Sequence, residues 1–149
     1  ASALRGERRG ILVVNGLGTK RARSREPERL MEWAFREFNN YALFKAGEQL
    51  EEAPVWLGTS NRVPLLIKED VILTFPRKHR RKMKVKLVYD GPIPAPIERG
   101  TEVGKVVVSI PGQTDLSVPV LAGADIEQLG LFGRLWSAMS TILLGQTGS

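Results

Sequence analysis

The chain has 149 residues, of which 42% are hydrophobic, so it is long enough to bury one small core. Its net charge of +6 favours an anionic partner, such as nucleic acid, an acidic lipid surface or an anionic polymer. The sequence has no cysteine and one histidine, which excludes disulfides, thiolate chemistry and a multi-histidine site, and we expect neither a metal nor a cofactor.

The first predicted elements are one strand and one helix. The apolar run GILVVNGL, residues 10–17, is rich in β-branched residues and predicts a buried strand. Residues 24–40 predict an amphipathic helix, because Ser24 can cap its first turn and apolar residues recur at helical spacing. One strand and one helix cannot bury both of their apolar faces, so we expect this region to need a partner.

The middle of the chain predicts a mainly β domain. Short apolar segments alternate with turn residues about every 8 to 12 positions, which is typical of a sandwich or barrel. A proline-rich stretch at residues 91–100 predicts a stiff connector, because proline cannot donate ladder hydrogen bonds. The predicted strands are residues 43–46, 53–57, 63–67, 71–75, 83–89, 103–110 and 116–121.

A basic segment lies between two of these predicted strands. We interpret it as a solvated turn, and the alternative is a surface that attracts anionic groups. Nucleic acid would need aromatic residues among the charges, and only Phe75 is close, so we expect no nucleic-acid partner. The single histidine has no adjacent carboxylate and predicts an ordinary surface residue. The segment contains Arg77, Lys78, His79, Arg80, Arg81, Lys82 and Lys84.

The C-terminal sequence GLFGRLWSAMSTILLG predicts an amphipathic helix. About 14 residues would make a helix some 21 Å long, too short for a hydrocarbon core of about 30 Å. We expect it to lie in a membrane interface, and the alternative is packing on the core of its own domain. The predicted membrane-contact residues are Leu131, Phe132, Leu135, Trp136, Met139, Ile142 and Leu143.

Several ordered motifs resemble the C-terminal half of low-molecular-mass penicillin-binding proteins, the serine-type D-Ala-D-Ala carboxypeptidases. They are ERLMEWAFREFNNYALFKAGE, EAPVWLG, VPLLIKEDVILTFPR, VYDGPIPAPIERGTEVG, PVLAG and GLFGRL. The resemblance implies that residues 1–41, with one strand and one helix, complete an α/β penicillin-binding catalytic domain. Residues 42–128 would then be a small antiparallel β-sandwich accessory domain, and residues 129–149 an amphipathic membrane-surface helix.

The catalytic motifs of such enzymes are Ser-x-x-Lys, Ser-x-Asn and Lys-Thr-Gly. None of them occurs here, so we expect the chain to begin just past them, any export signal to lie upstream, and the chain alone to be inactive. The resemblance implies that Arg23 pairs with the terminal carboxylate of the substrate. Arg21 and Arg25 leave the register open, and the alternative is a solvent-exposed connector.

The resemblance also implies a function in peptidoglycan maturation and cell shape, on the periplasmic face of the inner membrane. The chain would complete the catalytic domain, space it from the membrane and anchor it there. Its expected partners are the upstream catalytic-domain polypeptide, the inner-membrane surface and, through the whole enzyme, peptidoglycan stem peptides. The alternative is an independent β-sandwich interaction module that binds anionic polymers or proteins through the basic segment.

Overall fold

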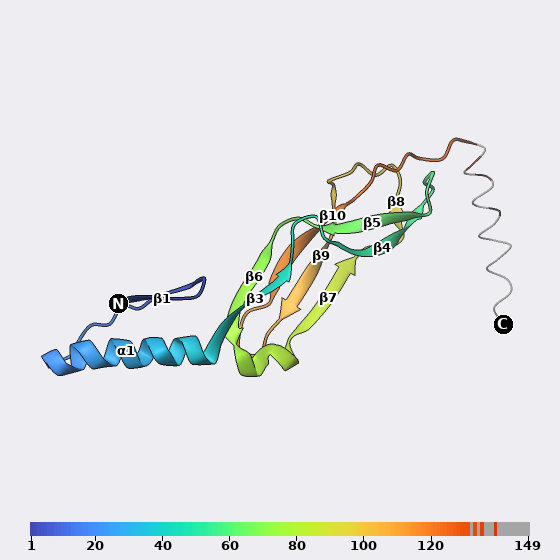
Figure 1. Cartoon of the computed structure of the whole chain (residues 1–149). Coiled ribbons are helices and arrows are strands. Elements are labelled where there is room, and N and C mark those ends of the chain that lie inside the picture. The colour runs from blue at the N-terminus through green and yellow to red at the C-terminus, as the bar shows by residue number, and fades with distance from the viewer. Residues whose placement is uncertain (132, 134, 136–138, 140–149) are drawn as a thin grey trace, which may run out of the picture.

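The structure is a computed structural model that describes residues 1–131, 133, 135 and 139 (Figure 1). Over these residues the chain forms a small N-terminal unit, made of a hairpin and a helix, and a larger β-rich domain. The mainly β fold predicted from the sequence is confirmed. Most of the predicted terminal helix lies outside the described residues.

The N-terminal hairpin pairs β1 (Ser2–Arg5) with β2 (Arg8–Ile11) in antiparallel register. Gly6 begins the two-residue turn at a φ of 61°, which glycine adopts without steric cost. The prediction of one buried strand at residues 10–17 is wrong, since β2 ends at Ile11, which is 74% exposed, and Val13 is 88% exposed. The hairpin meets another element on one face only, so this apolar run has no second layer to bury it.

Helix α1 (Lys20–Glu37) begins four residues earlier than predicted. The Thr19 hydroxyl caps it, accepting a hydrogen bond of 3.1 Å from the Ala22 N–H. Ser24, the predicted cap, therefore lies inside the first turns. The helix also ends earlier than predicted, because Phe38 is already extended and begins the next strand.

Helix α1 packs on the hairpin through Met31 and Phe35, its two buried residues. A Cβ on Gly10 of β2 would lie 2.6 Å from the Met31 Sδ, so any larger residue would displace the side chains that pack the helix on the strand. The guanidinium groups of Arg5 and Arg8 lie 5.1 and 5.2 Å from the centre of the Phe35 ring. Neither buried residue belongs to the core of the β-rich domain, so hairpin and helix form a unit with its own packing.

The β-rich domain contains two sheets. Six strands pair in the order β7-β9-β10-β5-β4-β8, and β3 and β6 form a separate pair. Each predicted strand overlaps an observed one, but β3 begins five residues earlier than predicted and takes over the end of the predicted helix. The short strand β8 was not predicted. The bounds are β3 Phe38–Phe44, β4 Gln49–Trp56, β5 Arg62–Ile67, β6 Val71–Pro76, η1 (a 3-10 turn) Arg77–Lys82, β7 Lys84–Tyr89, β8 Ile93–Pro94, β9 Glu102–Ser109 and β10 Leu116–Ala122.

One hydrophobic core joins the two sheets. Strand β5 contributes Val63, Leu65 and Ile67, whose spacing of two places them on the same buried face. Strand β6 contributes Phe75, which is fully buried and stacks on the Tyr41 ring of β3 with 4.4 Å between ring centroids. The β3–β6 pair therefore belongs to the same domain as the six-stranded sheet, as the predicted sandwich requires.

The proline-rich connector also contributes to this core. Its Ile93, Ala95 and Ile97 are buried, and they alternate with the exposed Pro94 and Pro96. The connector is thus an extended segment with one buried face. Its first part forms β8, which pairs in parallel with the end of β4.

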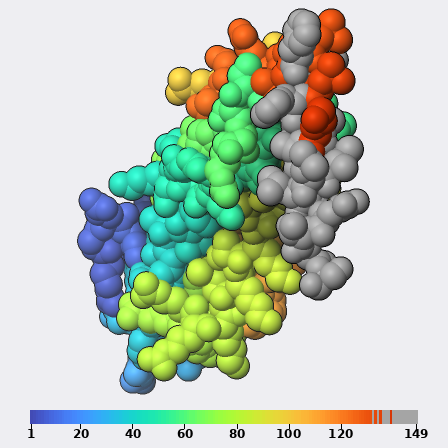
Figure 2. Space-filling model, turned by 90° about the vertical axis from the view of Figure 1, so that its right-hand side faces the viewer, coloured from blue at the N-terminus to red at the C-terminus, as the bar shows by residue number. Residues whose placement is uncertain are grey.

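The two ends of the β-rich domain differ. At one end, Phe38 of β3 pairs with Pro76 of β6, so η1 begins beside the end of α1 (Figure 1). At the other end, the Leu129 N–H donates a hydrogen bond of 2.8 Å to the Leu57 carbonyl, just after β4. Figure 2 shows this contrast, with η1 and the start of β7 at the lower end of the face and the last described residues at its upper end.

Candidate functional site

The predicted substrate-binding residue, Arg23, lies in the first turns of α1. Its Nε donates a hydrogen bond of 3.0 Å to the Leu17 carbonyl, which ties the extended segment before the helix to α1. Arg23 also lines a hollow together with Val14 and Pro27. Within the described part of the chain its other guanidinium nitrogens form no hydrogen bond, so they are available to donate hydrogen bonds to a carboxylate. Its role with substrate stays a prediction.

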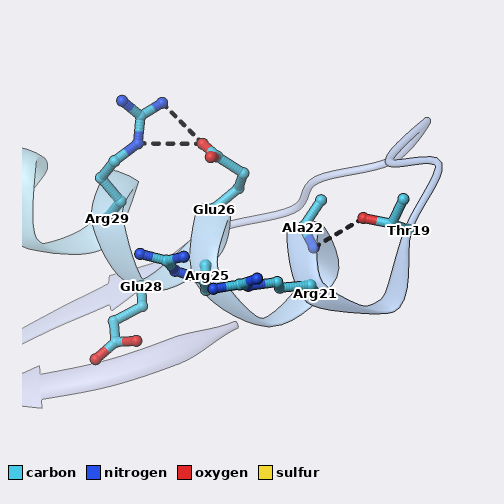
Figure 3. A pocket seen from close by; sticks show the side chains of 7 residues that line it. All are labelled: Thr19, Arg21, Ala22, Arg25, Glu26, Glu28 and Arg29. Atoms are coloured by element: carbon cyan, nitrogen blue, oxygen red, sulfur yellow. Dashed lines mark hydrogen bonds and ion pairs between the residues drawn. The ribbon is translucent and has the colours of Figure 1, made fainter.

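The two alternative arginines, Arg21 and Arg25, lie on another side of the same helix. They are four residues apart, so they share one face, whereas Arg23 is two residues from each and points elsewhere. Figure 3 shows both side chains along an open hollow, which also contains the exposed Glu26–Arg29 ion pair of 2.8 Å. The structure thus places the three candidate arginines on two different faces of α1. One binding cleft can use only one of these faces.

The N-terminal unit exposes an unusual amount of apolar surface for its size. Leu4, Ile11 and Val13 are 72%, 74% and 88% exposed, and Trp33 of α1 is 46% exposed. Apolar surface gathered in one small unit is typical of a contact with another protein or domain. Leu4, Ile11 and Val13 lie on the face of the hairpin that points away from α1, and we call these three residues the docking surface. Trp33 is two residues from each of the buried Met31 and Phe35, so it lies on the opposite side of α1 and does not belong to this surface.

The predicted basic segment forms η1 and the start of β7, and its description as a solvated turn is confirmed for its arginines and lysines. Among residues 1–131, 133, 135 and 139, none of these cations forms an ion pair with a carboxylate. Lys86 extends the charge along β7, because residues two apart in a strand share a face. We call the set Arg77, Lys78, Arg80, Arg81, Lys82, Lys84 and Lys86 the basic surface.

Two residues of η1 contact the domain beneath it. The Arg80 guanidinium lies 5.1 Å from the centre of the Tyr41 ring, a cation–π contact that orients it. His79 is half-buried rather than on the open surface as predicted. Its Nδ1 is turned into the protein, where no other described residue forms a hydrogen bond with it. Over the described residues there is no cluster of three or more histidine, aspartate or glutamate side chains that could hold a metal ion.

The C-terminal segment is described at only some positions. Leu131, Leu135 and Met139, which are four residues apart in turn, are 79%, 66% and 56% exposed. The other predicted membrane-contact residues, Phe132, Trp136, Ile142 and Leu143, lie outside the described residues, so the membrane role stays a prediction. None of the helices described is long and apolar enough to cross a membrane.

One residue near this segment was missed by the sequence analysis. Trp56, the last residue of β4, is 56% exposed and immediately precedes Leu57, the partner of the Leu129 N–H. The motif EAPVWLG contains it. The alternation of side chains along a strand, however, does not tell whether the face that carries Trp56 is buried or exposed. The structure places this exposed ring at the end of the domain where the C-terminal segment leaves.

These features define the class of protein. A small β domain with its own core, joined to a helix–hairpin unit that packs separately, is typical of an accessory domain in a larger protein. The sequence model of one family, described as "Penicillin-binding protein 5, C-terminal domain", matches residues 38–128, which span the β-rich domain from the start of β3. The chain belongs to this family, which confirms the resemblance seen in the sequence motifs.

Curated relatives are D-alanyl-D-alanine carboxypeptidases. The chain is 32% identical over 136 residues to DacA of Escherichia coli K12, covering 91% of this chain and 34% of DacA. It is 31% identical over 127 residues to DacA of Haemophilus influenzae, covering 85% and 32% of the two chains. With DacF of Bacillus subtilis the identity is 28% over 140 residues, covering 93% and 36%. The chain thus spans about a third of the length of these relatives.

Solved structures agree with this assignment. Penicillin-binding protein 5 from Haemophilus influenzae superposes with a TM-score of 0.62 at 28% sequence identity, covering 74% of this chain and 32% of that one. The D-alanyl-D-alanine carboxypeptidase DacD from Francisella tularensis superposes with a TM-score of 0.65 at 22% identity, covering 85% and 32%. The second similarity is evidence for the fold alone.

Proposed function

We propose that this chain acts as the C-terminal part of a serine-type D-alanyl-D-alanine carboxypeptidase in peptidoglycan maturation. The observation that carries the proposal is the docking surface of Leu4, Ile11 and Val13, which lies outside the β-rich core and beside a domain of this family. Such a surface fits the missing layer of a catalytic domain, from which the reactive serine would come. Family membership favours this function over an independent interaction module.

The proposal divides the work among three segments. Residues 1–41 complete the catalytic domain, and residues 42–128 hold that domain away from the bilayer. Residues 129–149 anchor the enzyme on the periplasmic face of the inner membrane. The exposed Leu131, Leu135 and Met139 support the anchor, since an interfacial helix buries one apolar face in the lipid.

Docking can be tested with the double variant Ile11→Asp, Val13→Asp. Two carboxylates on the docking surface would have to be desolvated in the contact, so we expect the variant not to co-purify with the catalytic-domain polypeptide of the same enzyme. The wild-type assembly should be labelled by a fluorescent penicillin. The matched control is Ile72→Asp, because Ile72 is 62% exposed on the β-rich domain. Equal assembly by all three proteins would contradict the docking surface.

Arg23 can be tested in the same assembly. If its guanidinium pairs with the terminal carboxylate of the peptide, Arg23→Gln should raise KM about tenfold or more with a smaller change in kcat. Arg23→Lys should recover only part of the loss, because lysine lacks the two-pronged geometry. Arg25→Gln, on the other face of α1, is the control. If the Arg25 variant has the larger effect, the substrate-binding face is the one that Figure 3 shows.

Anchoring is tested by flotation with anionic lipid vesicles. We expect the full chain to float with the vesicles and a truncation ending at Gly130 to remain at the bottom. Both proteins keep the β-rich domain, since the hydrogen bond from Leu129 to Leu57 is retained. Equal flotation of the two would refute the anchoring role of residues 131–149.

A further inference from the structure

The basic surface gathers seven of the 22 lysines and arginines of the chain into the ten residues 77–86. The net charge of the whole chain is +6, and without these seven cations the rest of the chain would carry a net charge of −1. Segment 77–86 contains no aspartate or glutamate to offset them. Charge concentrated in this way acts on a partner at one place rather than over the whole molecule.

One cation of the basic surface is held against the core, and the others are free to bind. Arg80 lies against the Tyr41 ring, and Tyr41 stacks on the fully buried Phe75. The other six cations have no side-chain hydrogen bond or ion pair within the described ranges, so none of them is neutralised. Unpaired cations can bind an anionic polymer without first breaking an ion pair within the chain.

The location of the basic surface indicates the kind of anion. It lies beside the end of α1, the element proposed to join the catalytic domain, and at the opposite end of the β-rich domain from Leu129 (Figure 1). A bilayer that met the domain at Leu129 would therefore lie at the other end of the domain from the basic surface. Nucleic acid would need free aromatic faces, and the Tyr41 ring is already in contact with the Arg80 guanidinium and the Phe75 ring.

We propose that the basic surface binds the carboxylate groups of peptidoglycan and so holds this anionic polymer beside the catalytic domain. This inference rests on the proposed function, because that function identifies which anionic polymer the domain meets. The contact is electrostatic and depends on several weak pairs, so added salt should weaken it strongly. The contact needs no specific sequence of stem peptide.

The test compares two variants of the full chain with equal loss of charge. The first, Arg77→Gln, Lys78→Gln, Arg81→Gln, Lys82→Gln, removes four exposed cations and spares Arg80 and its contact with Tyr41. The second is the matched control, with four exposed cations replaced by glutamine elsewhere on the β-rich domain. Those cations are Lys45, Arg62, Lys68 and Arg99.

The measurement is co-sedimentation with purified peptidoglycan sacculi at low salt. We expect the first variant to bind about tenfold more weakly than wild type, and the control to change less than about threefold, because only the first removes clustered charge. Sacculi whose carboxylates have been converted to amides should bind none of the three proteins well. Thermal melts should match, since the replaced side chains form no hydrogen bond or ion pair within the described structure.

Three outcomes would overturn the proposal. Equal losses in both variants would show that net charge alone matters. Retained binding to sacculi with lost flotation on phosphatidylglycerol vesicles would assign the basic surface to lipid. Loss of co-purification with the catalytic-domain polypeptide would assign it to the domain contact. Failure of the docking surface, measured with Ile11→Asp, Val13→Asp, would instead refute the proposed function and leave the sacculus result independent of it.

Discussion

Phe75 holds the β3–β6 pair on the rest of the domain, and we predict that Phe75→Ala removes a large part of the stability. Its side chain is fully buried and stacks on Tyr41 at 4.4 Å between centroids. Replacing a buried phenylalanine by alanine typically costs about 3–5 kcal/mol, from lost burial and the cavity that remains. The free energy of unfolding of a domain of this size is usually about 5–15 kcal/mol, so the variant would retain little stability.

Urea unfolding, followed by circular dichroism and tryptophan fluorescence, measures this loss. The matched control is Ile72→Ala on the same strand, where the side chain is 62% exposed and the loss should stay below about 1 kcal/mol. A double-mutant cycle with Tyr41→Ala should give a coupling of about 0.5–1.5 kcal/mol from the ring contact.

The result that would refute this reasoning is a Phe75→Ala variant that loses no more stability than Ile72→Ala. The β3–β6 pair would then not share the core of the six-stranded sheet. Because this pair connects α1 to the domain and leads into η1, a displaced pair would also move the basic surface. The sacculus experiment on Phe75→Ala would show that displacement as weaker binding.

Two further predictions concern local structure. Thr19→Ala removes the cap of α1 and should cost about 1 kcal/mol, seen as faster hydrogen exchange in the first turn of the helix, whereas Thr59→Ala, whose hydroxyl forms no contact in the described structure, should change little. Gly104→Ala would place a Cβ 2.6 Å from the Val88 carbonyl oxygen, so we expect a loss of about 1–3 kcal/mol in urea unfolding. Gly18→Ala has open space around the new methyl group and should be neutral, and equal effects of the two would contradict the close approach of β9 to β7.

Local patterns predicted most of the β-rich domain. The alternation of Val63, Leu65 and Ile67 identified a strand with one buried face, and β5 has that form. Helix bounds were less accurate, because both Thr19 and Ser24 can cap a helix and the sequence offers no way to choose. The observed start follows from the extended backbone at Thr19, whose hydroxyl meets the Ala22 N–H.

Burial of the N-terminal apolar run could not be predicted from its composition. Residues 10–17 have the pattern of a buried strand, yet β2 ends at Ile11 and Val13 is almost fully exposed. Burial needs a second layer, and a second layer is a property of the packing rather than of the run itself. The exposed run became the clearest sign of a docking surface only when the structure showed what surrounds it.

The sequence by itself determined the family, through ordered motifs, and the concentration of positive charge in segment 77–86. Only the tertiary structure decided which arginines of α1 share a face, that Arg80 rests on Tyr41, and that the basic surface lies at the end of the domain away from Leu129. The reason is that motifs and charge are properties of neighbouring residues. Positions at the ends of a sheet arise from strand pairings between residues far apart in the chain, such as Phe38 with Pro76.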